Sequence, residues 1–200
     1  VSNLLPWIRI SSAYRTREYN GLIITSNQSG DNFSSRYGNT QTAGTIGRDF
    51  NGKSVTEEKS VRGLRPSPII DALEVKNGSE GLTRKCSFTI KCFSLGQVEL
   101  LMQYFLEPRF FALIEWGWNT NQGYQQQAKL QSGTGLDPVC EMISYQNLAT
   151  LKKKRKESEG HYDAFLGVIA GGGFSYGEDE TFNLNVEVVT QGEIPSYLQL

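Results

Sequence analysis

The sequence predicts a mainly β fold, a β-barrel or β-sandwich with one or two flanking helices. Apolar and polar residues alternate over 86–92 and over 182–188, which is typical of strands with one buried face. Two further runs, 110–118 and 162–170, are apolar at both alternating positions and indicate strands that are covered on both sides. Only the segment 94–108 carries a complete helical signature. Strands therefore outnumber helices.

A hairpin is predicted near the centre of the chain. Residues 69–76 end in an alternating run and precede Asn77-Gly78, a dipeptide suited to the positive φ angles of a tight turn. The alternating strand at about 83–93 follows. We therefore expect these two strands to pair.

The predicted helix has a full set of start signals. Ser94 as the N-cap residue and Gln97 three positions later form a capping box, while Phe93 and Val98 occupy the positions of a hydrophobic staple. The apolar stripe with helical spacing consists of Val98, Leu101, Met102 and Phe105. Pro108 ends the helix. We expect the stripe to pack on the sheet as core rather than to hold a cofactor.

Two polar insertions interrupt the predicted strands. Residues 25–63 are mostly Ser, Thr, Asn, Gln, Gly and charged residues, so we expect an arm that orders on a neighbouring protein rather than packing into its own core. Residues 119–135 are rich in Gln and Gly and are typical of a loop. After them, Asp137-Pro138 can begin a helix that runs into the basic stretch 152–156, since cations suit a helix C-terminus.

The composition favours one soluble domain over residues 1–200. The chain has 200 residues with 38% hydrophobic and 20% charged side chains, and its formal net charge of -1 gives no global attraction to nucleic acid or to an anionic membrane. No apolar run approaches the roughly 18 residues of a membrane-spanning helix. The chain begins with Val1 rather than Met, which suggests a processed product or part of a longer polypeptide.

The three cysteines favour a reducing compartment. An odd number in a chain of this size argues against a disulfide-stapled scaffold. Cys86 and Cys92 lie about 20 Å apart on one predicted strand, which is too far for a bridge. We expect them, with Cys140, to be small core residues.

A search for reactive groups leads us to expect no catalytic residue, no cofactor and no metal, and hence a protein that is not an enzyme. His161 is the only histidine and lies at a loop-to-strand junction, where an ordinary surface residue is expected. The glycines 171–173 lead into a strand rather than a helix, so they indicate a flexible or bulged turn and not a phosphate cradle. Residues 178–180 indicate a solvated hairpin tip, and the run 152–156 a solvated helix end.

Two alternatives use the tryptophans of the run 110–118. Glu115 beside Trp116 and Trp118 resembles the acid of a glycan-cleaving enzyme. Such an enzyme needs a second carboxylate at a defined distance, and the sequence does not indicate which residue would supply it. The two tryptophans share one strand face and can also form the stacking platform of a carbohydrate-binding module. Burial of both side chains would exclude both alternatives.

An order of short motifs resembles that of the virion structural proteins of contractile-tailed phages. The motifs are Ser67-Pro-Ile-Ile-Asp-Ala-Leu-Glu-Val75, Arg84-Lys-Cys-Ser-Phe-Thr-Ile90, Leu95-Gly-Gln-Val-Glu-Leu100 with Tyr104-Phe-Leu-Glu-Pro108, Leu113-Ile-Glu-Trp-Gly-Trp118, Tyr162-Asp-Ala164 with Gly167, the strand 182–189, and Gly192-Glu193. They span about 66–119 and 161–198. The two polar insertions and the glycines 171–173 lie outside the pattern.

The resemblance implies a tail-tube-like fold and a structural subunit of the tail tube or baseplate hub. Such a subunit would assemble with copies of itself and with other tail or baseplate proteins into a ring around the central channel, with three-fold or pseudo-six-fold symmetry. It would reside in the virion tail, and in the host cytoplasm during assembly, with no small-molecule substrate, no sequence-specific nucleic acid and no membrane span. The predicted core consists of Phe88, Ile90, Val98, Leu101, Phe105, Trp116, Trp118, Phe182, Leu184 and Val186.

The residues themselves add one reason to expect assembly. The strands 110–118 and 162–170 are apolar on both faces, yet only one helix has a strong apolar stripe that can cover a sheet. We therefore expect another subunit to cover part of this surface, and closed symmetric oligomers are the common solution.

Overall fold

The computed structural model describes residues 5–26, 45–49, 53–56, 66–78, 83–119, 151–153, 155–177 and 179–190. These residues form a nine-stranded antiparallel sheet with the order β4-β3-β2-β1-β7-β8-β9-β6-β5. The elements are β1 (Leu5–Arg15), β2 (Asn20–Ser26), β3 (Thr45–Arg48), β4 (Ser54–Thr56), β5 (Ile69–Asn77), β6 (Arg84–Cys92), α2 (Leu95–Phe105), β7 (Phe111–Asn119), β8 (Tyr162–Tyr176) and β9 (Phe182–Val189). Residues 151–153 and 155–157 are also helical. The mainly β prediction is confirmed.

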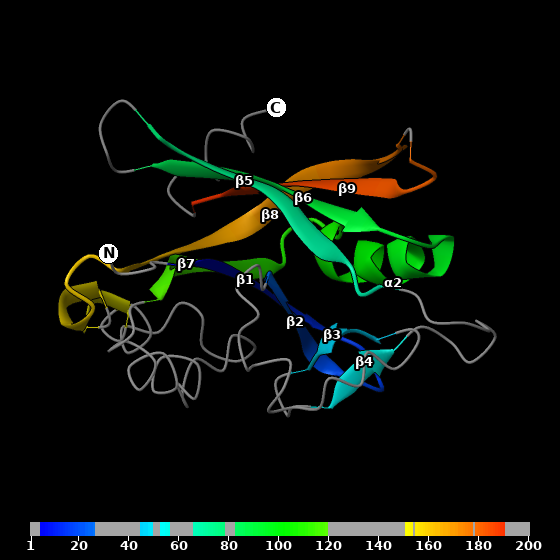
Figure 1. Cartoon of the computed structure of the whole chain (residues 1–200), viewed down its shortest axis with the longest axis horizontal. Coiled ribbons are helices and arrows are strands. Elements are labelled where there is room, and N and C mark those ends of the chain that lie inside the picture. Colours follow the sequence, from blue (N-terminus) through cyan, green and yellow to red (C-terminus); the bar gives the residue numbers. More distant parts are fainter. Residues whose placement is uncertain are drawn as a thin grey trace.

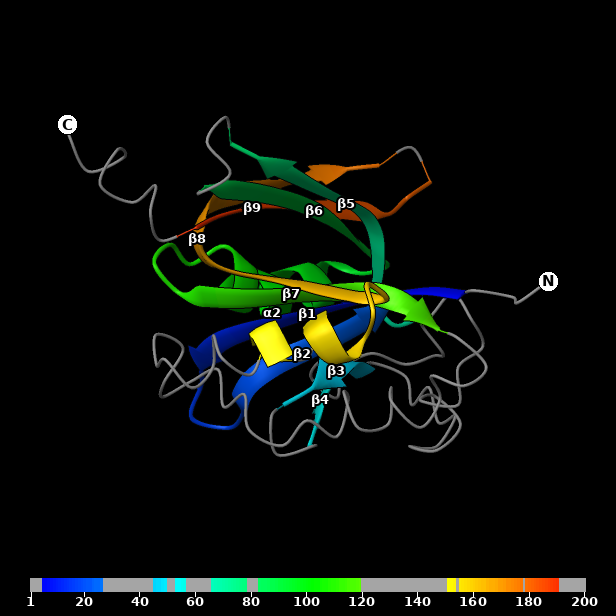
Figure 2. The same cartoon turned by 90° about the vertical axis from the view of Figure 1, so that its left-hand side faces the viewer.

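The sheet folds over into two layers (Figures 1 and 2). The upper layer in Figure 1 holds β5, β6 and β9, and the lower layer holds β7, β1, β2, β3 and β4. The long strand β8 belongs to both, because its first half pairs with β7 and its second half with β9. A bulge between Ile169 and Gly171 lies where it changes partner. The glycines 171–173 were expected to form a flexible or bulged turn; this is corrected, because all three are paired with β9 within the bulged strand β8.

The main core lies between the layers and is closed by α2. Its buried side chains come from both layers and from one face of the helix. The stripe positions Val98, Leu101 and Phe105 have no exposed side-chain surface, and neither has Tyr104, which the sequence stripe omitted. Phe88 and Phe105 meet edge to face, with ring centroids 5.8 Å apart, so the helix is packed directly on β6.

The start of α2 is fixed by Ser94 and Gln97, the two residues predicted from the sequence to form a capping box. Ser94 Oγ accepts a hydrogen bond from the backbone N–H of Gln97 at 3.2 Å. The Gln97 Oε1 atom accepts from the N–H of Phe93 at 2.7 Å, and its Nε2 atom donates to the carbonyl of Pro66 at 2.9 Å. This buried amide thus joins the helix to the residues that precede β5. The helix ends at the C-cap Leu106, ahead of the proline expected to stop it.

The predicted hairpin is present, but its turn is not at Asn77-Gly78. Asn77 still pairs with Arg84 at the end of β5, and the N–H of Gly78 donates to the carbonyl of Thr83 at 2.7 Å. The ladder therefore continues past the dipeptide. The connection falls at 79–82, outside the described residues.

Part of the first polar insertion packs into the core of its own chain, so that prediction was wrong for these residues. The short strands β3 and β4 pair with each other, and β3 pairs with β2. Ile46 is 2% exposed and Val55 is fully buried in the main core. The other residues of 25–63 and the insertion 119–135, apart from Thr25, Ser26 and Asn119, lie outside the described residues, as does Asp137-Pro138.

The second face of β7 and β8 is covered within the chain. Leu113, Tyr162 and Ala164 form a smaller cluster with Trp7 of β1 and with Leu151 of the helical segment. The two-sided apolar pattern over this part of the strands is therefore accounted for without a second subunit, whereas Phe111 and Val168 on the same face lie outside the cluster. Evidence for assembly with another subunit must therefore come from exposed surface elsewhere on the protein.

Candidate functional site

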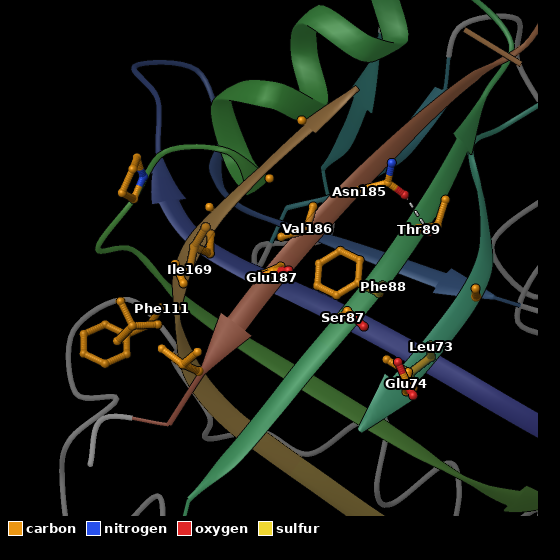
Figure 3. A pocket seen from close by; sticks show the side chains of 18 of the residues that line it. Leu73, Glu74, Ser87, Phe88, Thr89, Phe111, Ile169, Asn185, Val186 and Glu187 are labelled. Carbon is orange, nitrogen blue, oxygen red and sulfur yellow. Dashed lines mark hydrogen bonds between the residues drawn. The ribbon is translucent and has the colours of Figure 1, made fainter. Parts of the chain in front are cut away.

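The upper layer carries a groove of about 1150 Å³ on the face that points away from α2. We call this the outer groove. Because side chains alternate across a strand, it is lined mainly by the residues between the buried ones, although buried residues such as Phe88 and Val186 also border it. Figure 3 shows Ser87 and Thr89 of β6, Asn185 and Glu187 of β9, and Glu74 of β5 around it, with Thr89 Oγ1 donating to Asn185 Oδ1 at 2.8 Å.

Bare backbone of β8 forms one wall of the outer groove. Gly171 pairs with Glu187 and Gly173 with Asn185, which places both glycines on the groove side. A Cβ atom at either position would meet nothing within 4 Å, whereas a Cβ atom at Gly172, on the opposite side, would press against the backbone of β9 and the end of α2. The packing of α2 thus requires only the middle glycine. The other two leave the wall open to close approach by another molecule.

One end of the groove is apolar. Phe111, Val168 and Val189 are neighbours across β7, β8 and β9, and all three line the groove. Ala170 and Ala72 add further small apolar surface. The groove therefore combines a polar floor with an apolar end.

The charges on the β5 and β9 sides of the groove are paired within the chain. Lys76 Nζ lies 3.1 Å from a carboxylate oxygen of Glu74, and Lys85 Nζ lies 2.9 Å from one of Glu187. Such solvent-exposed pairs contribute about 0–1 kcal/mol to stability, so they can exchange partners at small cost.

Arg109 lies at the mouth of the groove and has an unusual backbone. Its φ of 76° is in the left-handed region, which is uncommon for residues other than glycine. The conformation is held because its N–H donates to the carbonyl of Ile169 at 3.1 Å, while the N–H of Ile169 donates to the carbonyl of Phe110 at 2.9 Å. The Arg109 side chain is exposed and has no ion-pair partner in the described part of the chain.

The lining offers main-chain, hydroxyl and amide groups together with apolar surface. Such a combination is suited to contact with another polypeptide. Within the described residues, no group of three or more His, Cys, Asp or Glu side chains is arranged to hold a metal ion. His161, the expected surface histidine, is exposed.

Glu115 belongs to a buried network on the same face of β7 as Leu113. Its side chain is 1% exposed, and Oε2 lies 2.5 Å from Arg9 Nη2. Oε1 accepts a hydrogen bond from the Tyr162 hydroxyl at 2.9 Å. Burial, followed by the charge of Glu115, raises the pKa of the Tyr162 hydroxyl above its ordinary value. Both carboxylate oxygens are thus engaged inside the protein.

The two tryptophans do not share the environment of Glu115. Trp116 and Trp118 point to the opposite face of β7, since they alternate with it. Trp116 is half-buried against the main core, whereas Trp118 is 49% exposed at the end of the strand. The expectation that Trp118 is a core residue is corrected, because it lies near the end of β7 and is paired with the exposed Pro6 of β1. The structure does not bring the carboxylate and the two rings together.

The other predicted core residues lie in or against the main core. Phe88, Ile90, Val98, Leu101, Phe105, Leu184 and Val186 are buried, and Phe182 packs against them as a partly buried residue. Cys86 and Cys92 are buried free thiols, and burial raises the pKa of each to about 12. Cys140 lies outside the described residues.

The basic run 152–156 is only partly a solvated helix end. Lys152, Lys153 and Lys156 are exposed, as expected. Arg155 instead donates to the Asp163 carboxylate and to the carbonyl of Ala164. Asp163 also lies 3.3 Å from Arg84 Nη1, so one carboxylate joins the helical segment, β8 and β6. This structural role was not apparent from the run of like charges.

Sequence reasoning missed the outer groove altogether. Its floor consists of the polar residues of alternating strands, which are normally the solvated face. The sequence feature that could have indicated the groove is the pair Gly171 and Gly173. These glycines pair with the polar residues Glu187 and Asn185 of β9. That signal becomes informative only when the register of β8 against β9 is known.

A comparison with protein-family models found no match to the chain, and comparisons with curated proteins and with solved structures also found none. Among the described helices, none is long and apolar enough to cross a membrane.

Proposed function

We propose that this chain is a structural subunit of a contractile phage tail, in the tail-tube or baseplate-hub class. In this role it acts by protein–protein assembly, forming a ring around the central channel with copies of itself and with other tail or baseplate proteins, and it performs no catalysis. It resides in the virion tail, after assembly in the host cytoplasm. The class rests on the resemblance of the motifs over 66–119 and 161–198.

The observation that carries the assembly role is the outer groove. It is large, and its lining has open backbone and an apolar end. A protein surface of this kind is suited to a partner that contributes both main-chain contacts and apolar side chains. The mainly β architecture with one closing helix is compatible with the tail-tube-like fold that the resemblance implies.

Electron microscopy of the particle tests this proposal. In tails purified from the phage that encodes the chain, we expect its density in the tube or hub, with contacts to neighbouring subunits that bury more than roughly 1,000 Å² each. Absence of the chain from purified particles that contain complete tails would contradict the proposal.

A carbohydrate-binding module is the second candidate, because Trp118 is 49% exposed and exposed tryptophan rings can stack on sugars. The same experiment separates the two. An isolated monomer on the particle exterior with Trp118 facing solvent would overturn the hub role and favour glycan binding.

A further inference from the structure

The end of the β8–β9 hairpin exposes large aromatic side chains. Phe174 is 51% exposed and Tyr176 is 66% exposed. They pair with Leu184 and Phe182, which places them on the α2 side of the sheet, and the Tyr176 ring meets the Phe182 ring edge to face with centroids 5.3 Å apart. We call Phe174 and Tyr176 the aromatic ridge.

The hairpin tip beside this ridge is acidic. The N–H of Gly177 donates to the carbonyl of Thr181 at 2.7 Å, which fixes the turn. Asp179 and Glu180 are exposed there. Asp179 pairs with Lys91 at 3.1 Å, whereas Glu180 has no ion-pair partner in the part of the chain that the structure describes.

The aromatic ridge of one chain cannot occupy the outer groove of the same chain. Both are built from β8 and β9, but the ridge lies on the α2 side and the groove on the opposite side of the same strands. The chain therefore carries an apolar projection and a partly apolar recess that face in opposite directions. A second copy can bring the two together.

We propose that the β8–β9 hairpin end of one copy inserts into the outer groove of the next copy. Phe174 and Tyr176 lie against the open wall at Gly171 and Gly173, where nothing occupies the space of a side chain. This inference rests on the proposed function and deepens it, because it names the contact that joins successive copies. Each copy uses one surface as donor and the other as acceptor, and repetition of such a head-to-tail contact closes into a ring when the rotation allows.

Charge complementarity selects a second copy as the occupant. Glu180 at the tip of one copy and Arg109 at the groove are opposite in charge, and neither has an ion-pair partner among the described residues. Lys76 and Lys85 do not line the groove, but they pair with its lining carboxylates Glu74 and Glu187 and so offset the negative charge of both. An acidic tip with aromatic flanks therefore matches a groove that carries the positive charge of Arg109 and an apolar end.

Two complementary variants test the contact. The ridge variant combines Phe174→Ser with Tyr176→Ser, and the groove variant combines Gly171→Leu with Gly173→Leu, at positions where a Cβ atom meets nothing within 4 Å. Trp118→Ser is the matched control, because it removes a similarly exposed aromatic ring from β7. Sedimentation velocity of the full chain over a range of concentrations measures association, and near-ultraviolet circular dichroism verifies the fold.

We expect the wild-type chain and the control to associate, and each double variant to weaken association at least tenfold. In an equimolar mixture of the two variants, only one kind of contact can form. It places the intact ridge of the groove variant in the intact groove of the ridge variant. The mixture should therefore form dimers and no larger oligomers. Association of either variant at the wild-type level, or a mixture that stays monomeric, would overturn the contact.

A charge exchange tests the same contact without altering the groove wall. Arg109→Glu or Glu180→Arg alone should weaken association, and the two variants combined in one chain should recover it. Failure of the combined variant to recover contradicts the pairing. If the wild-type chain is monomeric in solution while microscopy finds it in the tail, the hairpin contact is overturned and the tail function stands.

Discussion

Leu101 lies in the middle of α2 with none of its side chain exposed, at the point where the helix closes the main core. Truncation of such a residue removes packed methyl groups and leaves a cavity. We expect Leu101→Ala to lower the free energy of unfolding by about 2–5 kcal/mol in a urea titration. Leu95→Ala, at a position that is 51% exposed on the same helix, is the control and should have little effect. A loss below about 1 kcal/mol would contradict this assignment of the buried face.

The buried thiols make stability sensitive to alkali. The pKa of Cys86 and of Cys92 is raised from 9.0 to about 12 because burial disfavours the thiolate. In the unfolded chain the thiols ionise near their ordinary pKa, so their contribution to stability is complete below about pH 9 and falls as the pH rises towards about 12.

The measurement is the free energy of unfolding at several pH values from about 8 to about 11. We expect it to fall with pH in the wild-type chain, and to fall less steeply in the double variant Cys86→Ala with Cys92→Ala. Equal slopes in both proteins would show that other groups, such as the buried Tyr162 hydroxyl, cause the alkaline loss.

At the scale of elements, the ion pair of Arg9 with Glu115 connects the neighbouring strands β1 and β7. Removal of one partner from a buried pair leaves an uncompensated charge, which typically costs about 3–5 kcal/mol, whereas replacement of both by apolar residues is much milder. We therefore expect Arg9→Met to be strongly destabilising and the double variant Arg9→Met with Glu115→Leu to recover part of the loss. Equal stability of the single and double variants in urea titrations would contradict a buried pair.

Elements with local signals could be predicted from the sequence. The capping box of α2, the alternation of β6 and β9, and the two-sided pattern of β7 all depend on residues close together in the chain. The turn after β5 was misplaced because Asn77-Gly78 also fits the end of a ladder. The strands β3 and β4 were missed because each has too few residues for an alternation to be recognised.

The candidate site could not be predicted in the same way. The outer groove depends on the registers of five strands. The burial and pairing of Glu115 depend on Arg9, which lies 106 residues earlier in the chain. The composition of a segment carries no information about which distant strand becomes its neighbour. The exposure of Trp118 likewise depends on its distant partner on β1, the exposed Pro6.

At the scale of the whole molecule, the two layers share one core and one strand. The main cluster draws buried residues from both layers, and β8 pairs in both. We therefore expect a single cooperative unfolding transition, with the same midpoint for tryptophan fluorescence, which reports the lower layer, and for hydrogen exchange of β6 amides, which reports the upper layer. Separate midpoints would show that the layers are independent units.

The sheet order also has a consequence for synthesis. The N-terminal strand β1 lies beside β7, and β6 lies beside the last strand β9, with Arg84 and Thr190 hydrogen-bonded across 106 residues. Each of these strands emerges from the ribosome long before its neighbour exists, and such distant pairings close slowly because the entropy of a long loop is lost first. The growing chain therefore carries two unpaired strand edges until translation passes β7 and then β9, and this is the interval in which it is most exposed to aggregation and most dependent on chaperones.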